Sequence, residues 1–168
     1  MKTVQREKRV VCCEPKDLSG GAVNGPWISM QNYQHATIYI ACGDVGADFT
    51  IELEQASDLS GTGAKTLALT EIYQADNSAS TVTDRDKFAA VAVTSDTHTV
   101  ANATDDSFHH LIELDSASLD RDNDFSAFRL ALSDAGSTAT YVFAVAEMKE
   151  ANFAGQEDST GILPSALG

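Results

Sequence analysis

The sequence predicts an all-β protein: an antiparallel β-sandwich with jelly-roll-like connectivity, an extended N-terminal arm and a C-terminal tail. Short segments with alternating apolar and polar residues, turn-forming residues between them, and the lack of an amphipathic run longer than about two helical turns all favour this fold. Many short strands with frequent turns are typical of sandwiches and barrels. At 168 residues the chain suits one domain with a substantial hydrophobic core.

We expect three regions: a basic arm with a Gly/Pro connector (1–26), the sandwich (27–148) and the tail (149–168). Residues 1–16 carry five basic and two acidic residues, whereas the rest carries six basic and 23 acidic ones, so the net charge is −14. A basic segment on an acidic body is either a solvated terminus or an arm that docks on a neighbouring acidic surface. Both readings stay open at this point.

Eight to ten strands are expected after the connector. The clearest is 48–54, where Phe49, Ile51 and Leu53 alternate with polar residues. The alternation of 65–70 slips at Ile72-Tyr73, which predicts a bulge or a change of sheet. Segment 88–94 is apolar on both faces, as an inner strand would be. The segments with the strongest pattern are 36–42, 48–54, 65–70, 88–94, 108–114, 128–132 and 140–146.

Turn residues separate these segments, including a short glycine loop at 60–63 that reads as a hairpin turn. The tail, 149–168, is punctuated by Gly and Ser but contains Ile162, Leu163 and Leu167. It is therefore expected to be either disordered or docked on the chain itself or on a partner.

The composition and the missing motifs argue against several classes of function. A strongly acidic chain is poorly suited to bind nucleic acid, because phosphates are met by Lys and Arg. No stretch approaches the roughly 20 apolar residues that span a bilayer, and no signal-peptide pattern begins the sequence, so we expect a protein made in the cytoplasm without membrane contact. Nucleophile-elbow, phosphate-loop and dinucleotide motifs are missing, so we expect no enzyme and no cofactor.

Cysteines, histidines and aspartates give few candidates for a site. Cys12, Cys13 and Cys42 are too few for a disulfide framework and lack metal-ligand spacing, so buried, reduced thiols are expected. The neighbouring residues His109 and His110 should point to opposite faces of a strand.

One acidic run resembles the start of a calcium loop. The run at 120–124 fails the EF-hand pattern, because Phe125 stands where Gly is needed and Ala131 where Glu is needed. Its three aspartates remain weak candidates for a nonstandard calcium site, against the alternative of an Asx-rich turn: Asp120, Asp122 and Asp124.

Two stretches resemble small structural proteins of tailed-bacteriophage virions, the group of head decoration, or cement, proteins. One is Gly-Pro-Trp-Ile-Ser-Met-Gln-Asn-Tyr-Gln-His-Ala-Thr-Ile-Tyr-Ile-Ala-Cys-Gly-Asp-Val-Gly at 25–46, with its continuation at 49–58 and 61–65. The other runs from Ile-Glu-Leu-Asp at 112–115 through 119–125 to Phe-Arg-Leu-Ala-Leu-Ser-Asp at 128–134. These motifs are structural rather than catalytic, and they cover roughly half of the chain.

The resemblance implies a sandwich on the capsid exterior, commonly a homotrimer at local three-fold positions, that binds the major capsid protein and reinforces the shell. On this hypothesis basic residues of the arm pair with acidic capsid groups: Lys2, Arg6, Lys8 and Arg9. Trp27 and Ile28 would anchor the arm or the trimer, unless Trp27 is simply a core aromatic. The alternatives are a neck or tail component of the virion, or a jelly roll that binds a ligand or glycan.

Overall fold

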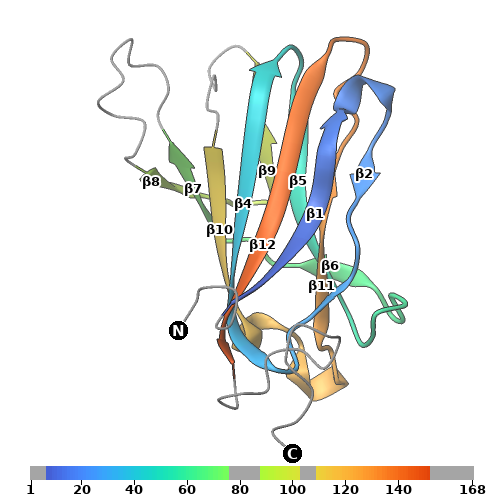
Figure 1. The fold of residues 1–168 in the computed structure, drawn as a ribbon, viewed down its shortest axis with the longest axis vertical. Helices are drawn as coiled ribbons and strands as arrows, with labels where there is room; N and C mark the ends of the chain where they lie inside the picture. The colour runs from blue at the N-terminus through green and yellow to red at the C-terminus, as the bar shows by residue number, and fades with distance from the viewer. Residues whose placement is uncertain (1–6, 76–87, 103–108, 152–168) are drawn as a thin grey trace, which may run out of the picture.

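The computed structural model describes residues 7–75, 88–102 and 109–151, which fold into two antiparallel sheets (Figure 1). Sheet A contains, in spatial order, β1 (Lys8–Asp17), β12 (Thr140–Ala151), β4 (Tyr33–Val45), β10 (His109–Asp115), β7 (Glu71–Ala75) and β8 (Phe88–Ala92). Sheet B contains β2 (Val23–Asn24), β11 (Ala127–Leu132), β5 (Phe49–Ala56) and β6 (Lys65–Leu67), with β3 (Ile28–Ser29) paired to β11 and β9 (Thr97–Val100) to β5. The remaining described elements are short 3₁₀ turns at Leu18–Gly20, Ser116–Ser118 and Arg121–Asn123.

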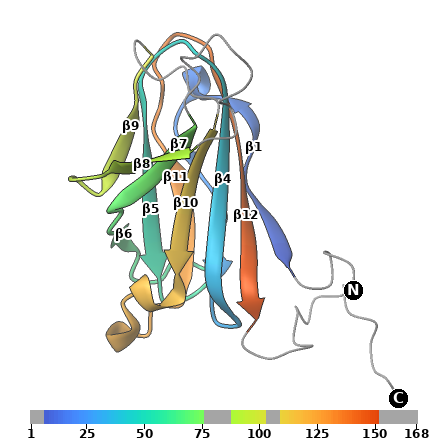
Figure 2. The same cartoon turned by 90° about the vertical axis from the view of Figure 1, so that its left-hand side faces the viewer.

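The two sheets pack face to face, as the view along the layers in Figure 2 shows, and the core lies between them. The alternating residues of the strands form this core. Ile38 and Ile112 point inward from sheet A, Phe49 and Phe128 point inward from sheet B, and all four are almost completely buried. The predicted β-sandwich is therefore confirmed. Its jelly-roll connectivity stays a prediction.

Two long strands form the centre of sheet A. β4 and β12 pair antiparallel from Thr140 opposite Val45 to Ala151 opposite Tyr33, with an irregularity near Val142. Both strands extend beyond the segments 36–42 and 140–146 that the alternating pattern predicted. Residues 149–151, expected in the tail, therefore belong to β12, and the rest of the tail lies outside the described residues.

The expectation of an N-terminal arm outside the sandwich is wrong for residues 8–26. Residues 8–17 form β1, which pairs with β12 as the edge strand of sheet A, and β2 joins sheet B. Cys12 and Cys13 are both buried, because β1 shifts register between Val11 and Cys13 and again before Lys16. Two adjacent buried residues break a period of two, so the strand was not visible in the sequence.

The remaining strands show where alternation predicts well and where it does not. The predicted slip at Ile72 marks a change of sheet, since β6 lies in sheet B and β7 in sheet A. The glycine loop at 60–63 is the predicted turn of the β5–β6 hairpin. Segment 88–94, expected to be an inner strand, instead forms β8 at the edge of sheet A, with Phe88 exposed. Strand β9 was not predicted.

Candidate interaction surface

The outer face of sheet A carries an unusual number of exposed hydrophobic side chains. In the described part of the chain five large hydrophobic residues are exposed, and four of them lie on sheet A: Val11 (47%), Tyr39 (38%), Phe88 (41%) and Tyr141 (56%). The solvent-facing side of an antiparallel sheet is usually polar. Contiguous exposed apolar surface of this kind commonly marks an interaction site.

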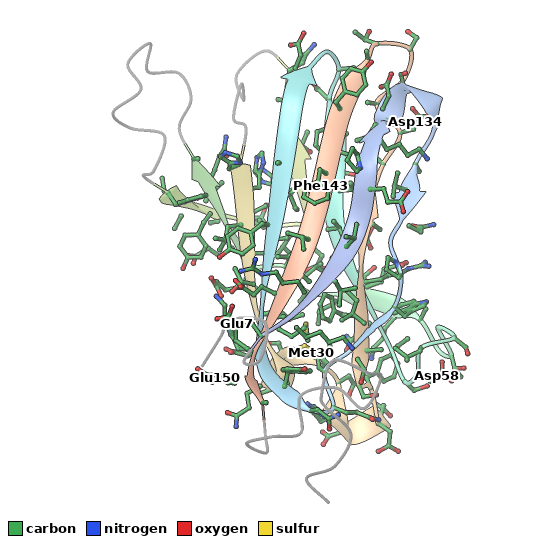
Figure 3. All side chains as sticks on the ribbon, in the orientation of Figure 1. Glu7, Met30, Asp58, Asp134, Phe143 and Glu150 are labelled. Carbon is green, nitrogen blue, oxygen red and sulfur yellow. The ribbon has the colours of Figure 1, made fainter. Side chains whose placement is uncertain are left out.

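Outward-facing apolar side chains of neighbouring strands lie side by side on this face because of the strand register. Ala41 of β4 lies opposite His109 of β10 on one side and Phe143 of β12 on the other. Val145 of β12 lies opposite Val11 of β1. Figure 3 shows Phe143 in the middle of this outer face.

An open groove of about 310 Å³ lies in this face, and its surface is almost entirely apolar. We call it the apolar groove and define it by six side chains: Tyr39, Ala41, Phe88, His109, Phe143 and Val145. The groove therefore spans the sheet from β12 across β4 and β10 to β8.

Near the end of β12 the same outer face becomes charged around the buried carboxylate of Glu147. Arg9 donates to Glu147 Oε1 from Nε at 3.1 Å and from Nη2 at 2.7 Å. Lys149 Nζ lies 3.5 Å from Glu147 Oε2 and donates to Thr37 Oγ1 at 3.1 Å. Burial alone would raise the pKa of Glu147, but its hydrogen bonds with Arg9 and Glu7 and the nearby Lys149 lower it.

His35 continues the charged row across β4 and β10. Its Nδ1 lies 2.9 Å from Asp115 Oδ1, and its Nε2 hydrogen-bonds with Glu113. Thr37 also donates to Glu113 Oε2 at 3.1 Å, which joins His35 to the cluster around Glu147. Partial burial lowers the pKa of His35, but its bonds to the two carboxylates outweigh this and raise the pKa above its usual value.

On the outer face of sheet B, Trp27 and Arg129 pack against each other. The guanidinium carbon of Arg129 lies 4.6 Å from the centre of the Trp27 ring, and Arg129 also pairs with Glu54. The loop after β5 closes against the indole at Gly61, where a Cβ would lie 2.6 Å from Trp27 Nε1. Trp27 is half-buried in this packing and not in the core.

The sequence-predicted contact residues do not gather at one place. Lys2 and Arg6 lie outside the described residues. Lys8 and Arg9 are part of β1, and the Arg9 side chain, although 63% exposed, is already paired with Glu147. Ile28 is buried in the core, so as folded it does not offer an outer contact.

The run at 120–124 forms a short 3₁₀ turn, with Asp120 before it and Asp124 after it. Asp120 accepts from Asn123 Nδ2 at 2.8 Å and pairs with Lys65, and these two contacts lower its pKa. Asp124, the C-cap of the 3₁₀ turn, adopts φ 59°, while Asp122 lies within the turn. Among the residues that the structure describes, no group of three or more His, Cys, Asp or Glu side chains is placed to hold a metal ion.

The three cysteines and the adjacent histidines lie as predicted. Cys12, Cys13 and Cys42 are free and buried. Burial raises the pKa of Cys12 and of Cys42 to about 12. His109 is exposed and His110 is buried, which confirms that they point to opposite faces.

One buried contact between the two sheets was missed from the sequence. The ring of His110 on β10 lies 5.4 Å from that of His98 on β9, centroid to centroid. Strand β9 was not predicted, so nothing in the sequence placed His98 inside the sandwich.

The apolar groove was also missed, although a signal for it existed. In β12 the outward set Tyr141, Phe143 and Val145 is as apolar as the inward set. A strand that is apolar on both faces in an antiparallel sheet indicates a covered outer face.

Comparison with known proteins gives structural similarity only. No family model and no curated protein matches the chain. Among solved structures, the SPBc2 prophage-derived protein YomS is similar with a TM-score of 0.47 and 9% identity, over 88% of this chain and 96% of that one. The infectious bursal disease virus VP2 subviral particle is similar with a TM-score of 0.25 and 11% sequence identity. The structure of the infectious bursal disease virus Gt strain is similar with a TM-score of 0.26 and 8% sequence identity. The chain spans only 42% and 40% of those two chains, and similarities of this size do not bear on what it binds.

The described residues contain no helix with the length and apolar character needed to span a bilayer.

Proposed function

We propose that the chain is a structural protein of a tailed-bacteriophage virion that decorates the outside of the head and stabilises the shell. Its partner is the major capsid protein, its assembled form is a homotrimer, and its action is mechanical rather than catalytic. The observation that carries the proposal is the apolar outer face of sheet A, where Val11, Tyr39, Phe88 and Tyr141 are exposed.

Two further points support it. The stretches that resemble decoration proteins include β4, β5 and most of β10 and β11, which form much of the frame of the sandwich. On a capsid, many copies bind a repeating lattice, so a modest apolar contact per copy is enough for stable attachment. The apolar face lies beside a charged row, an arrangement in which the apolar area supplies affinity and the charges supply orientation.

The first test is co-sedimentation of the purified chain with undecorated heads, with the bound copies counted per particle. Saturation at hundreds of copies, in fixed ratio to the major capsid protein, is the expected result. A ring-sized handful would move the protein to the neck or tail. Absence of binding would overturn the head proposal and favour a sandwich that binds a ligand or glycan.

A pair of variants tests which surface makes the contact. Tyr141→Ser removes an exposed aromatic side chain from sheet A, and Leu59→Ser removes an exposed side chain of similar character from the loop beyond β5. We expect Tyr141→Ser to lower occupancy on heads and Leu59→Ser to leave it unchanged. Equal effects would remove sheet A as the contact face.

The predicted role of the N-terminal basic residues needs a gentler change than truncation. Deleting residues 1–16 would remove most of β1 and expose the core, so loss of binding would say nothing about charge. The double variant Lys2→Glu/Arg6→Glu changes only residues outside the described sandwich, whereas Lys16→Glu/Arg121→Glu changes the net charge equally at exposed sites within it. Weaker binding in the first variant alone would support the role.

A further inference from the structure

The apolar groove is a surface that folding leaves uncovered by any described residue. Tyr39 and Phe88 remain 38% and 41% exposed there, next to Phe143 and Val145. Below Tyr39, Ala41, His109, Phe143 and Val145 the backbone is paired in the ladder β12–β4–β10, so most of the groove offers side-chain contact. A fitting occupant is an apolar segment that needs no strand pairing.

The C-terminal residues of the chain have this chemistry. Residues 159–168 contain no charged residue, and Ile162, Leu163 and Leu167 lie among them. The other segments outside the described residues, 1–6, 76–87 and 103–108, all contain charged residues. Pro164 lacks an N–H donor, which disfavours addition as a regular strand but allows the segment to lie across side chains.

The C-terminal segment also begins close enough to the apolar groove to reach it. β12 ends at Ala151 and itself supplies Phe143, eight residues earlier, to the groove. Eight residues of strand correspond to about 26 Å. Leu163 follows Ala151 by twelve residues, which can extend up to about 40 Å, so the chain can reverse after β12 and still reach the groove.

We propose that residues 161–168 dock in the apolar groove of their own chain, with Ile162 and Leu163 as the buried side chains. The C-terminal segment then acts as a strap across the outer face of sheet A. This inference concerns the free chain and does not depend on the proposed function.

The test is a disulfide cross-link in the full-length chain that carries Ala41→Cys and Ser165→Cys. Ala41 lies in the groove, and the native thiols are buried with raised pKa values, so they compete little. Under mild oxidation we expect an intrachain disulfide that forms at least about tenfold faster than in the same chain with Ile162→Ser and Leu163→Ser added. That comparison keeps both cysteines and the length of the segment unchanged.

A positional control places the first cysteine on the opposite face. Ala131→Cys, on the outer side of β11, replaces Ala41→Cys and should cross-link slowly to Ser165→Cys. Equal rates with and without the serine substitutions, or equal rates at the two faces, would overturn the proposal. Disulfides that join two chains would also overturn it and assign the groove to the segment of a second copy.

A second readout avoids any substitution in the sandwich. In the otherwise unaltered chain, Ile162→Ser/Leu163→Ser should raise binding of an apolar fluorescent dye several-fold, because the groove becomes free. Unchanged dye binding would contradict the strap. Neither experiment contains phage heads, so its failure is distinct from a failure of head binding.

Discussion

Gly61 should be a sensitive loop position beside sheet B, because two separate costs meet there. Its φ of +82° lies in the left-handed region, which costs a non-glycine residue about 1–2 kcal/mol. A Cβ would also lie 2.6 Å from Trp27 Nε1 and 2.9 Å from Cε2, so the indole must move. Moving it weakens the contact with Arg129, a cation–π interaction of about 0.5–1 kcal/mol. We expect Gly61→Ala to lower the free energy of unfolding by about 1.5–3 kcal/mol.

Gly136→Ala is the matched control. Gly136 has a similar φ of +74°, but a Cβ there would meet nothing within 4 Å, so only the backbone cost of about 1–2 kcal/mol applies. Urea denaturation gives both free energies, and the fluorescence of Trp27, the only tryptophan, reports whether the indole has moved. Equal destabilisation by the two substitutions, with unchanged emission, would refute the reasoning that Gly61 is required to seat Trp27.

Three further predictions concern charge, thiols and the core. Because the pKa of His35 is raised, its ion pairs stabilise the fold fully below about pH 6.5, and this stabilisation is lost as the pH rises through the folded-state pKa. The wild-type chain should therefore become slightly less stable, by under about 1 kcal/mol, between about pH 6 and pH 8. The variant His35→Asn should not show this decrease. A wild-type profile as flat as that of the variant would contradict this. Cys12 and Cys42 should react with a thiol reagent at about pH 8 only after unfolding, and rapid native labelling would show that they are not buried. Phe128→Ala, at a fully buried position, should cost about 3–5 kcal/mol in urea denaturation, and a cost under about 1 kcal/mol would place its ring outside the core.

The parts of the fold that could be predicted from sequence are those where one face is buried and the register is regular. Segment 48–54 is such a case, because every second residue of β5 points into the core. β1 could not be predicted, since its two register shifts bury the adjacent Cys12 and Cys13. In β8 a run of apolar residues suggested an inner strand, but local composition does not show which strands will lie beside it.

The candidate surface depended even more on tertiary structure. The groove joins Phe88 to Phe143, 55 positions apart in the sequence, and neither residue's neighbours predict that they meet. Arg9 illustrates the opposite error: its charge indicated an external partner, but its position in β1 opposite Glu147 gives it an internal one. Counting charges shows that a segment favours an oppositely charged partner, but it does not show which partner that is.

The two outer faces of the sandwich differ in a way that decides where a partner should be sought. On sheet B, Trp27 packs against Arg129, which also pairs with Glu54, and the loop at Gly61 closes over the indole. On sheet A the charged side chains near the end of β12 pair with one another, as Arg9 does with Glu147. The apolar area around Phe143 is not covered by any described residue. A purely structural role for sheet A would need only one apolar face, the one in the core. The second apolar face is therefore the feature that function or self-docking must explain, and the cross-link and head-binding experiments test these two explanations independently.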